Sequence, residues 1–366
     1  METGRHTAEP VHSSRHRRRK LKPIWLVIVT DILLAGLFLC IFSTFHHVIP
    51  LMKARSNAAK PSPTSAVSYA PAAEETPDVS RPAETPAAPE PSMEPEVIDT
   101  RTEWQKKFEE HFTDETVRTE NSYSSPNVSV EITTHEMLDD NGRTSVYYLA
   151  DIYAASLDCF KTYTAHNDCI YMDTQDVTEM DTAVDAIVSI SGDYITLQYS
   201  GFLMRNGVLY SSEYTSCDIC VLYSDGTMET YGANSYSIED ILARDPVQIW
   251  NFGPMLLDGS GAVMDNYNVN LTVSYPNPRS AIGYYEPGHY CFVIVDGRQD
   301  GYSYGLNIPQ LASIFAELGC TSAYNLDGGG SAVMLFGHEK YSRQSNGGRS
   351  LGDILYIAEP ATDGQG

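Results

Sequence analysis

The sequence predicts an α+β fold, a mixed sheet with flanking helices, preceded by a transmembrane helix and a disordered linker. Alternating apolar and polar residues, separated by Asn-Gly and Asp-Gly turns, indicate strands over most of the chain beyond about residue 123. Helical spacing is rarer there, and one uninterrupted apolar stretch stands near the N-terminus. We therefore predict a basic cytoplasmic tail (1–23), a membrane anchor (24–45), a disordered linker (46–100), a helical lead-in (101–122) and a folded domain (123–360).

A dense basic run at residues 15–22 directly precedes the apolar stretch at residues 24–45. The apolar stretch is long enough to cross a bilayer as a helix, and the basic residues before it favour a cytoplasmic N-terminus. A cleaved signal peptide is the alternative, but its apolar core would be shorter, and no small-x-small cleavage site closes this stretch. The sequence thus predicts a single-pass membrane protein with an extracytoplasmic C-terminal domain.

Two segments connect the anchor to the domain. Residues 57–97 are rich in Pro, Ala, Ser, Thr and Glu and contain almost no large apolar side chains, so they cannot bury enough surface to fold. Trp104, Phe108 and Phe112 then recur at the spacing of one helix face across residues 101–115. We expect a spacer followed by a helix that docks on the domain.

Strand and turn signals dominate the domain. Asp140-Asn141-Gly142 lies between two alternating segments, which is a strong hairpin signal. Further turns are expected at Asn206-Gly207 and Asp225-Gly226. The predicted strand regions are residues 127–133, 144–155, 202–209 and 219–230.

Two helices are predicted within the folded domain, at residues 237–243 and 309–318. The second begins at Asn307 or Pro309 and ends at Gly319, because these residue types favour helix starts and stops.

This second helix separates two apolar segments, residues 290–296 and 323–326, which suggests a β-α-β unit. A right-handed crossover would bring Asp296 and Asp327, at the ends of the two strands, to the same edge of the sheet.

Seven cysteines bear on the cellular compartment. Cys40 lies in the predicted anchor, and the other six are compatible with three disulfides in an oxidising environment. Cys217-x-x-Cys220 is also compatible with zinc, although no second close Cys or His pair accompanies it. The local disulfide candidates are Cys159–Cys169, which we favour, and Cys217–Cys220.

A polar and glycine-rich stretch interrupts the apolar sequence near the C-terminus. Asp327 follows an apolar run, the glycines 328–330 come next, and Ser331 leads into a second apolar run. Glycine reaches positive φ readily and leaves backbone N–H groups uncovered, so this pattern favours a ligand site beside a carboxylate. A plain glycine turn is the alternative.

The string NLDGGGSAVM around these residues, with NPRSAIG at 277–283 and VDGR at 295–298, resembles the phosphodiester glycosidase family. The resemblance covers about residues 151–357. It implies a phosphodiester glycosidase-like fold and hydrolysis of the bond between a sugar and a phosphate. Where the family commonly has asparagine after a strand, Ser191 stands here, and this change would weaken or redirect activity if the amide orients substrate.

The formal net charge of −24 makes nucleic acid an unsuitable partner, because binding a polyanion requires a basic surface. A phosphodiester substrate is also negatively charged, so this acidic protein would need basic residues at the binding site. Arginine offers a planar fork of donors for phosphate oxygens. We assign ligand contact to Arg279 and Arg298, which lie in the family motifs, and surface salt bridges to Arg343 and Arg349.

Glycoside hydrolysis usually employs two carboxyl groups. The candidates are Asp193, Asp258, Asp296 and Asp327, of which Asp327 is the first choice and Asp296 the second, as nucleophile or base. Aspartates can also hold a hard cation such as calcium, although no cofactor is certain. By resemblance Asn251-Phe252-Gly253-Pro254 lines the pocket, with a structural turn as the alternative. The predicted substrate-binding residues are Arg279, Arg298, Asn251, Gly253, Gly328, Gly329, Gly330, Ser331 and Asp193.

Together these features predict a membrane-anchored extracytoplasmic hydrolase that cleaves a sugar-1-phosphodiester in a cell-surface glycan or wall polymer. The alternative is a non-enzymatic surface module that binds phosphodiester-containing polysaccharide during exopolysaccharide biosynthesis. Turnover of a sugar-1-phosphodiester distinguishes the two.

Overall fold

A computed structural model describes residues 99–361 apart from residues 140, 170–172 and 196–200. The predicted tail, the predicted anchor at 24–45 and nearly all of the linker lie outside these residues. Within the described part of the chain, no helix is both long and apolar enough to cross a membrane.

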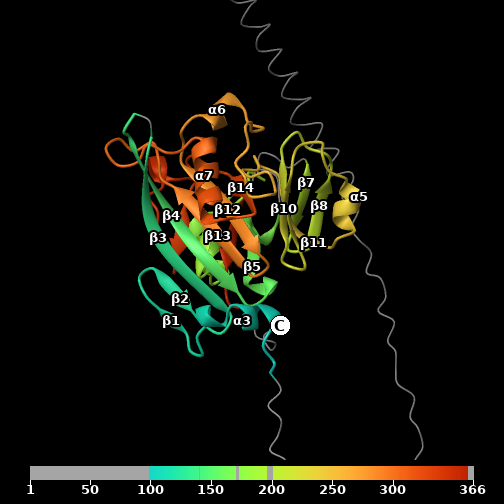
Figure 1. The fold of residues 1–366 in the computed structure, drawn as a ribbon. Helices are drawn as coiled ribbons and strands as arrows, with labels where there is room; N and C mark the ends of the chain where they lie inside the picture. The colour runs from blue at the N-terminus through green and yellow to red at the C-terminus, as the bar shows by residue number, and fades with distance from the viewer. Residues whose placement is uncertain (1–98, 140, 170–172, 196–200, 362–366) are drawn as a thin grey trace, which may run out of the picture. The chain divides into compact units, whose positions relative to one another are not determined.

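The sheet-rich α+β class is confirmed. The sequence predicts a mixed sheet, but the described strands form three sheets in which every pairing is antiparallel (Figure 1). The first sheet has the order β1 (Val117–Arg118), β2 (Ser122–Ser124), β3 (Val128–Leu138), β4 (Thr144–Ala154), β13 (His289–Val295), β12 (Arg279–Glu286), β14 (Ser322–Leu326). The second has the order β10 (Met228–Tyr231), β9 (Ile219–Tyr223), β11 (Pro246–Trp250), β7 (Phe202–Arg205), β8 (Val208–Ser212). The third has the order β16 (Glu339–Lys340), β15 (Met334–Phe336), β6 (Val188–Ser191), β17 (Asp353–Ile357), β5 (Phe160–Thr164).

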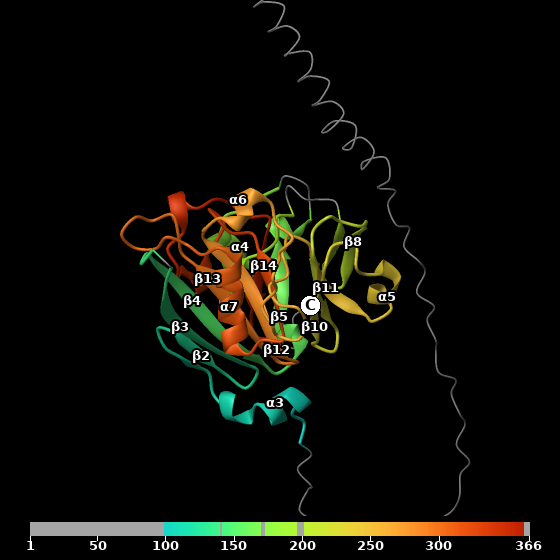
Figure 2. The same ribbon diagram turned by 45° about the horizontal axis from the view of Figure 1, so that its top comes forward.

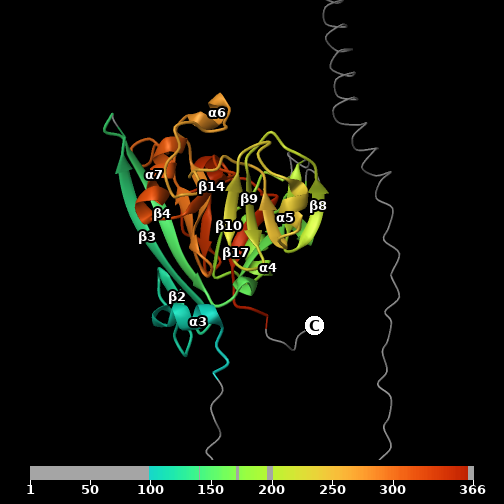
Figure 3. The same ribbon diagram turned by 45° about the vertical axis from the view of Figure 1, so that its right-hand side comes forward.

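Short helices cover parts of these sheets. Helix α5 packs on the apolar face of the second sheet, and α4 packs on the third sheet (Figure 3). The described α-helices are α3 (Glu103–Lys107), α4 (Val177–Ala183), α5 (Ile238–Leu242), α6 (Leu271–Ser274) and α7 (Ile308–Leu318), and the 3-10 turns are η2 (Glu109–His111), η3 (Leu157–Cys159), η4 (Ala165–Asn167) and η5 (Ser345–Gly347).

Helix α7 has the boundaries that the sequence predicts. The Asn307 side chain accepts from the backbone N–H of Gln310, whose side chain reciprocates in a capping box, and Gly319 ends the helix at φ 81°. Leu311 and Phe315 on its apolar face pack against the first sheet, and Figure 2 shows the helix lying along β12 and β13.

Strand β13 shows how the core is divided. Phe292 and Ile294 face a core shared with the third sheet, whereas Cys291 and Val293 face α7. Successive side chains of a strand point to opposite faces, so a continuous apolar run serves a strand that is buried on both sides.

The predicted β-α-β unit is present with one strand inserted. Strand β12 lies between β13 and β14 and is antiparallel to both, so β13 and β14 run parallel to each other. Arg279 pairs with Val295, and Ser280 pairs with Leu326. Asp296 and Asp327 therefore lie at the same edge of the sheet, as expected, but about 10 Å apart because two strand spacings separate their chains.

The predicted hairpins form as expected. Strands β3 and β4 pair around the Asn141-Gly142 turn, with β3 continuing to Leu138, beyond its predicted end. The turns at Asn206-Gly207 and Asp225-Gly226 join β7 to β8 and β9 to β10.

The prediction of one helix over residues 101–115 is wrong in length. Helix α3 ends at Lys107, because Phe108 leaves helical geometry at φ −114° and ψ 31°, and the 3-10 turn η2 follows. The expected docking does occur: the buried Phe108 ring lies 5.2 Å from that of Tyr153, centroid to centroid. Trp104 lies close against Gly226 and Gly288, where any larger residue would collide with its ring.

The predicted disulfides Cys159–Cys169 and Cys217–Cys220 are absent, and the six described cysteines are thiols. Cys159 directly precedes β5, whereas Cys169 lies beyond η4, the 3-10 turn that follows β5, and the two side chains belong to different buried clusters. Instead, the Sγ atoms of Cys291 and Cys320 lie 3.8 Å apart.

We expect Cys291 and Cys320 to be the pair that crosslinks when the protein is oxidised. Both side chains are buried, and their contact joins β13 to the turn after α7 without a large movement. Mass spectrometry of non-reduced peptides from oxidised protein should recover this pair. Recovery of Cys159–Cys169 instead would contradict the geometry described here.

Candidate active site

The glycine loop begins where β14 ends, at Asp327. The Asp327 backbone N–H donates to the Gly192 carbonyl at 2.9 Å, and its own carbonyl accepts from Ser191 Oγ at 3.2 Å. The serine at the position where the family resemblance implies asparagine therefore holds the main chain of Asp327. Because Ser191 ends β6, the third sheet positions the end of the first.

The Asp327 carboxylate is held by two side chains. Its Oδ2 accepts from Ser331 Oγ at 2.6 Å and from Arg349 Nη2 at 2.7 Å, and Arg349 Nε donates to the same Ser331 Oγ. The side chain of Asp327 is 12% exposed and that of Arg349 is 46% exposed. The carboxylate is thus sheltered, while the guanidinium has one side open to solvent.

Burial raises the pKa of Asp327 to about 6, against the opposing effects of the Ser331 hydrogen bond and the Arg349 charge. The nearby charge of Asp193 raises it further. A carboxyl group with a pKa close to neutrality can exchange a proton during a reaction, which an ordinary surface aspartate does poorly.

The three glycines lie in different surroundings. A Cβ on Gly328 would lie 2.6 Å from the Pro278 carbonyl oxygen, and one on Gly329, at φ 61°, would lie 3.2 Å from Arg298 Nη2. A Cβ on Gly330 would meet open space. Close packing therefore requires glycine at position 328, whereas the positive φ favours it at position 329, and the exposed Arg298 guanidinium lies beside the loop.

Asp296 lies in a second cluster. Its carboxylate accepts from the hydroxyl groups of Tyr302 at 2.9 Å and Tyr148 at 3.2 Å, and from the backbone N–H of Arg343 at 3.0 Å. It is 2% exposed, and burial raises its pKa. In the part of the chain that the structure describes, no hydrogen bond or ion pair joins it to Asp327, so the two predicted catalytic aspartates are not brought together as a pair.

The segment from Arg343 to Arg349 connects the two clusters. It starts at the Asp296 carboxylate, and its Gln344 side chain donates to the Gly330 carbonyl at 3.1 Å. Ser345 Oγ then donates to the Gly329 carbonyl at 3.3 Å, and Arg349 reaches Asp327. This segment therefore lies along the whole glycine loop.

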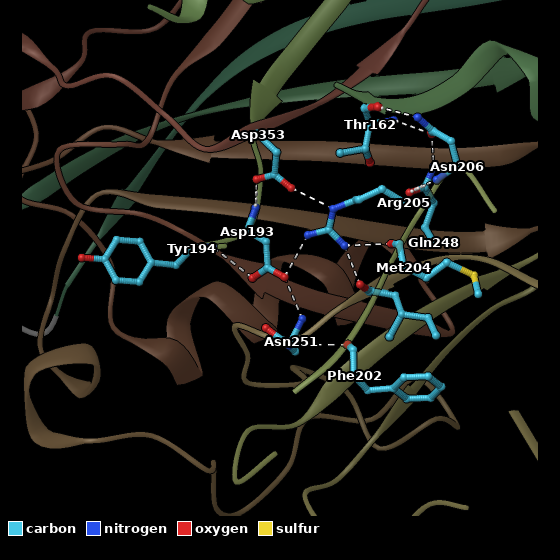
Figure 4. A network of polar contacts seen from close by, with 11 residues as sticks. Thr162, Asp193, Tyr194, Phe202, Met204, Arg205, Asn206, Gln248, Asn251 and Asp353 are labelled. Atoms are coloured by element: carbon cyan, nitrogen blue, oxygen red, sulfur yellow. Dashed lines mark hydrogen bonds and ion pairs between the residues drawn. The ribbon is translucent and has the colours of Figure 1, made fainter. Parts of the chain in front are cut away.

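Asp193 belongs to a buried ionic network, drawn in Figure 4. Its Oδ2 accepts from Arg205 Nη2 at 3.1 Å and from the Asn251 backbone N–H at 2.8 Å, and Arg205 Nε donates to Asp353 Oδ2 at 2.9 Å. The Asp193 side chain is 0% exposed and its contacts are those of a structural residue, so the substrate contact expected for it stays a prediction. It supports the site from within.

The segment that begins at Asn251 braces β14. The Gly253 carbonyl accepts from the Asn325 side chain at 2.7 Å, and the Pro254 carbonyl accepts from the Asn325 backbone N–H at 3.0 Å. Gly253 has φ 80° and precedes a cis-proline. These contacts correspond to the structural-turn alternative.

Two other aspartates accept hydrogen bonds from backbone N–H groups. Asp258 is exposed and accepts from the N–H and Oγ of Ser260, and these hydrogen bonds lower its pKa. Asp218 accepts from the backbone N–H groups of Ala233 and Met255.

Arg279 is 3% exposed and binds main-chain oxygens. Its Nε donates to the Leu306 carbonyl at 2.9 Å, and its Nη2 donates to the carbonyls of Val273 and Tyr275 at 2.6 and 2.7 Å. Burial, helped by the charge of Arg298, lowers its pKa to about 10. The phosphate contact expected for Arg279 stays a prediction, and the observed contacts are those of a structural residue.

Arg279→Ala is accordingly expected to destabilise the fold. Three carbonyl oxygens, one in a buried contact (Leu306) and two in partly buried contacts (Val273 and Tyr275), would lose a charged donor, at a cost of roughly 3 kcal/mol. Thermal melting should show a drop of several degrees relative to the parent, with Arg298→Ala, an exposed change in the same region, as the matched control. A variant that melts like the parent and loses only substrate affinity would restore Arg279 as a ligand contact.

Within the described residues, no group of three His, Cys, Asp or Glu side chains is placed to hold a metal ion. The oxygens of Asp296 and Asp327 face O–H and N–H donors instead. A cavity of about 520 Å³ lies near the Asp296 cluster, where Tyr302 contributes both to its wall and to the hydrogen bond with Asp296. Asp327 is not among the residues that line it.

Sequence reasoning missed three residues of this region. Arg349 was assigned a surface salt bridge, although its partner is Asp327 itself. Arg205 and Asp353 carried no motif signal, because Arg205 ends one ordinary strand and Asp353 begins another. The scarcity of arginine in so acidic a chain was the one available hint for Arg349.

Comparisons with known proteins agree with this fold. Residues 184–358 match the family model described as phosphodiester glycosidase. The SPbeta prophage-derived uncharacterized protein YomE of Bacillus subtilis (strain 168) is 29% identical over 181 residues, which are 48% of this chain and 28% of that protein. The match thus spans less than a third of the relative's length.

Two solved structures resemble the domain in fold. The catalytic domain of zebrafish N-acetylglucosamine-1-phosphodiester alpha-N-acetylglucosaminidase has a TM-score of 0.54 at 22% identity, covering 67% of this chain and 88% of that chain. A hypothetical protein from Synechocystis has a TM-score of 0.51 at 12% identity, covering 64% of this chain and 62% of that chain. At these identities the likeness concerns the fold alone.

Proposed function

Residues 184–358 belong to the phosphodiester glycosidase family, and from that premise we propose that the protein is a membrane-anchored, extracytoplasmic hydrolase of a sugar-1-phosphodiester. We place its substrate in a cell-surface glycan or wall polymer. The observation that carries the proposal is the contact between Asp327, with its raised pKa, and the half-exposed Arg349 at the glycine loop.

In the proposed reaction the bond between the anomeric carbon and the phosphate oxygen breaks. Ionised Asp327 takes a proton from the attacking water, or attacks the carbon itself before water releases the sugar. The phosphate leaves with the bonding electron pair as a phosphate monoester of the aglycone. Arg349 faces this phosphate and stabilises its charge, with the exposed Arg298 beside Gly329 as a second donor.

Asp296 has a supporting part in this proposal. Its carboxylate is occupied by two tyrosine hydroxyls and the Arg343 N–H, and it anchors the segment that carries Arg349. A phosphate monoester is a good leaving group, so the reaction does not require a second carboxylic acid at this point.

A substrate screen tests the proposal. Full-length protein in detergent is incubated with alkyl diesters of hexose-1-phosphates and N-acetylhexosamine-1-phosphates, and free sugar and alkyl phosphate are measured. Release of both in equal amounts by the parent, but not by Asp327→Asn, supports the hydrolase. Saturable binding of the same diesters without turnover would instead favour the non-enzymatic binding module.

The proposed topology has its own test. Protease added to intact cells should release the domain by cutting between residues 57 and 97, because that segment contains too few large apolar side chains to fold. Complete protection of the domain until the membrane is permeabilised would place it on the cytoplasmic side.

A further inference from the structure

We propose that the buried network of Asp193, Arg205 and Asp353 is a positioning device, which holds Asp327 and Arg349 in place from beneath the glycine loop. The network reaches them by two routes, through Gly192 and through Tyr194. This inference rests on the proposed function only in taking Asp327 as the reacting carboxylate.

The first route runs through the backbone of Gly192. Its carbonyl accepts from the Asp327 N–H at 2.9 Å, and its N–H donates to the Asp353 carbonyl at 3.1 Å. A Cβ on Gly192 would lie 2.5 Å from Asp353 Oδ1, so only glycine allows the carboxylate to lie directly against the chain. Asp353 Oδ1 also accepts from the next N–H, that of Asp193, at 2.7 Å. The position of Asp353 is thereby transmitted to the main chain of Asp327.

The second route runs through Tyr194. Its backbone N–H donates to Asp193 Oδ1 at 3.1 Å, while its ring lies beneath the Arg349 guanidinium at 5.3 Å. Arg349 is thus held between the Tyr194 ring and the Asp327 carboxylate. Cation–π contact and ion pairing together restrict a side chain that would otherwise move freely in solvent.

Arg205 joins the two carboxylates of the network, those of Asp193 and Asp353, as Figure 4 shows. It ends β7 of the second sheet, whereas Asp353 begins β17 of the third and Asp193 follows β6. Its guanidinium donates to both carboxylates and, through Nη1, to the carbonyls of Met204 and Ile249. A planar fork can serve four acceptors in one plane, and a lysine ammonium cannot.

The network also places charge near the reacting group. Two carboxylates share one guanidinium, and all three side chains are at most 2% exposed. Of the charged groups around Asp327, Arg349 favours its ionised form and Asp193 opposes it. A change in the network should therefore be visible in the titration of Asp327, which a purely structural role would not alter.

The test measures that titration directly. Full-length protein in detergent is labelled with aspartate carrying ¹³C in the side-chain carboxyl, and the Asp327 resonance is assigned by its loss in Asp327→Asn. In Asp193→Asn the Asp327 midpoint should move to lower pH by about half a unit or more, because a neighbouring negative charge is gone. Asp258→Asn, which changes an exposed carboxylate in a separate turn, should leave it unchanged.

A second variant guards against failure to fold. Tyr194→Leu leaves the buried ions intact but removes the ring beneath Arg349, and it should move the Asp327 midpoint upward as the cation becomes less well held. Parental midpoints in folded Asp193→Asn and Tyr194→Leu would overturn the proposal. Because no substrate is needed, this result is independent of the screen described above.

Where the screen yields a cleaved diester, kinetics add a further readout. Arg205→Lys should lower kcat about tenfold or more with little change in KM, because the misplaced groups do chemistry rather than capture substrate. If kcat falls only as far as the loss of folded protein explains, and the pH profile does not shift, the network is a structural ion pair and not a positioning device.

Discussion

Asp327→Asn is expected to lower hydrolysis of a sugar-1-phosphodiester by roughly a hundredfold or more while the fold is retained. Asparagine has nearly the same shape, can keep one contact with Ser331, and cannot act as base or nucleophile. Initial rates with the diester found in the screen measure the effect. Near-parental turnover in a variant that melts like the parent would remove the glycine loop as the reactive centre.

The same variant has a predicted effect on stability. Burial raises the pKa of Asp327 from 3.8 to about 6, so the folded protein binds this proton more tightly than the unfolded chain. The stabilisation from protonated Asp327 is complete below about pH 4 and is lost as pH rises through 6. Asparagine resembles the protonated form, so at pH 8 the variant should be more stable than the parent, by up to about 3 kcal/mol.

Melting curves of the parent and of Asp327→Asn at pH 4 and pH 8 test this expectation. The difference between variant and parent should grow with pH, since only the parent loses its proton over that range. A variant that is less stable than the parent at pH 8 would show that the Arg349 ion pair outweighs the cost of burying the charge.

Arg349→Ala is expected to reduce kcat/KM about ten- to a hundredfold. Loss of a charge-assisted contact to the leaving phosphate corresponds to roughly 1.5–3 kcal/mol in the transition state. Its removal also takes a positive charge from Asp327, so the Asp327 pKa should rise and the acidic limb of the pH profile should move to higher pH.

Arg343→Ala is the matched control for this change. It lies on the same segment, but its guanidinium stacks over the Tyr302 ring at 4.3 Å. Its contact with Asp296 comes from the backbone, which alanine keeps. Equal loss of activity in the two variants would indicate a general effect of basic charge on the segment rather than a specific contact at Asp327.

Much of the local structure could be read from the sequence. Asn307 and Gly319 bound α7 because capping depends on residues within one helical turn. The Asn-Gly and Asp-Gly turns formed for the same reason, since a tight turn is decided by the φ values that its own residues tolerate. The glycine loop and Asp327 were also found from sequence, because their pattern lies within a few consecutive residues.

Partnerships between distant residues were decided by the tertiary structure. Arg279 and Arg349 are alike as residue types, yet sheet register buries the first against carbonyl oxygens and leaves the second half-exposed on Asp327. Cys291 meets Cys320 because α7 folds back on β13, whereas Cys159 and Cys169, closer in sequence, are separated by a strand.

The Asp193–Arg205–Asp353 network is the clearest example of contacts that local sequence does not predict. Its ion pairs span 12 and 148 residues of sequence and form only where strands of the second and third sheets converge. The sequence by itself determined the turns, the caps and the glycine loop, whose energies depend on neighbouring residues. The identity of the groups around Asp327 depended on burial and strand register, which arise only when distant segments pack together.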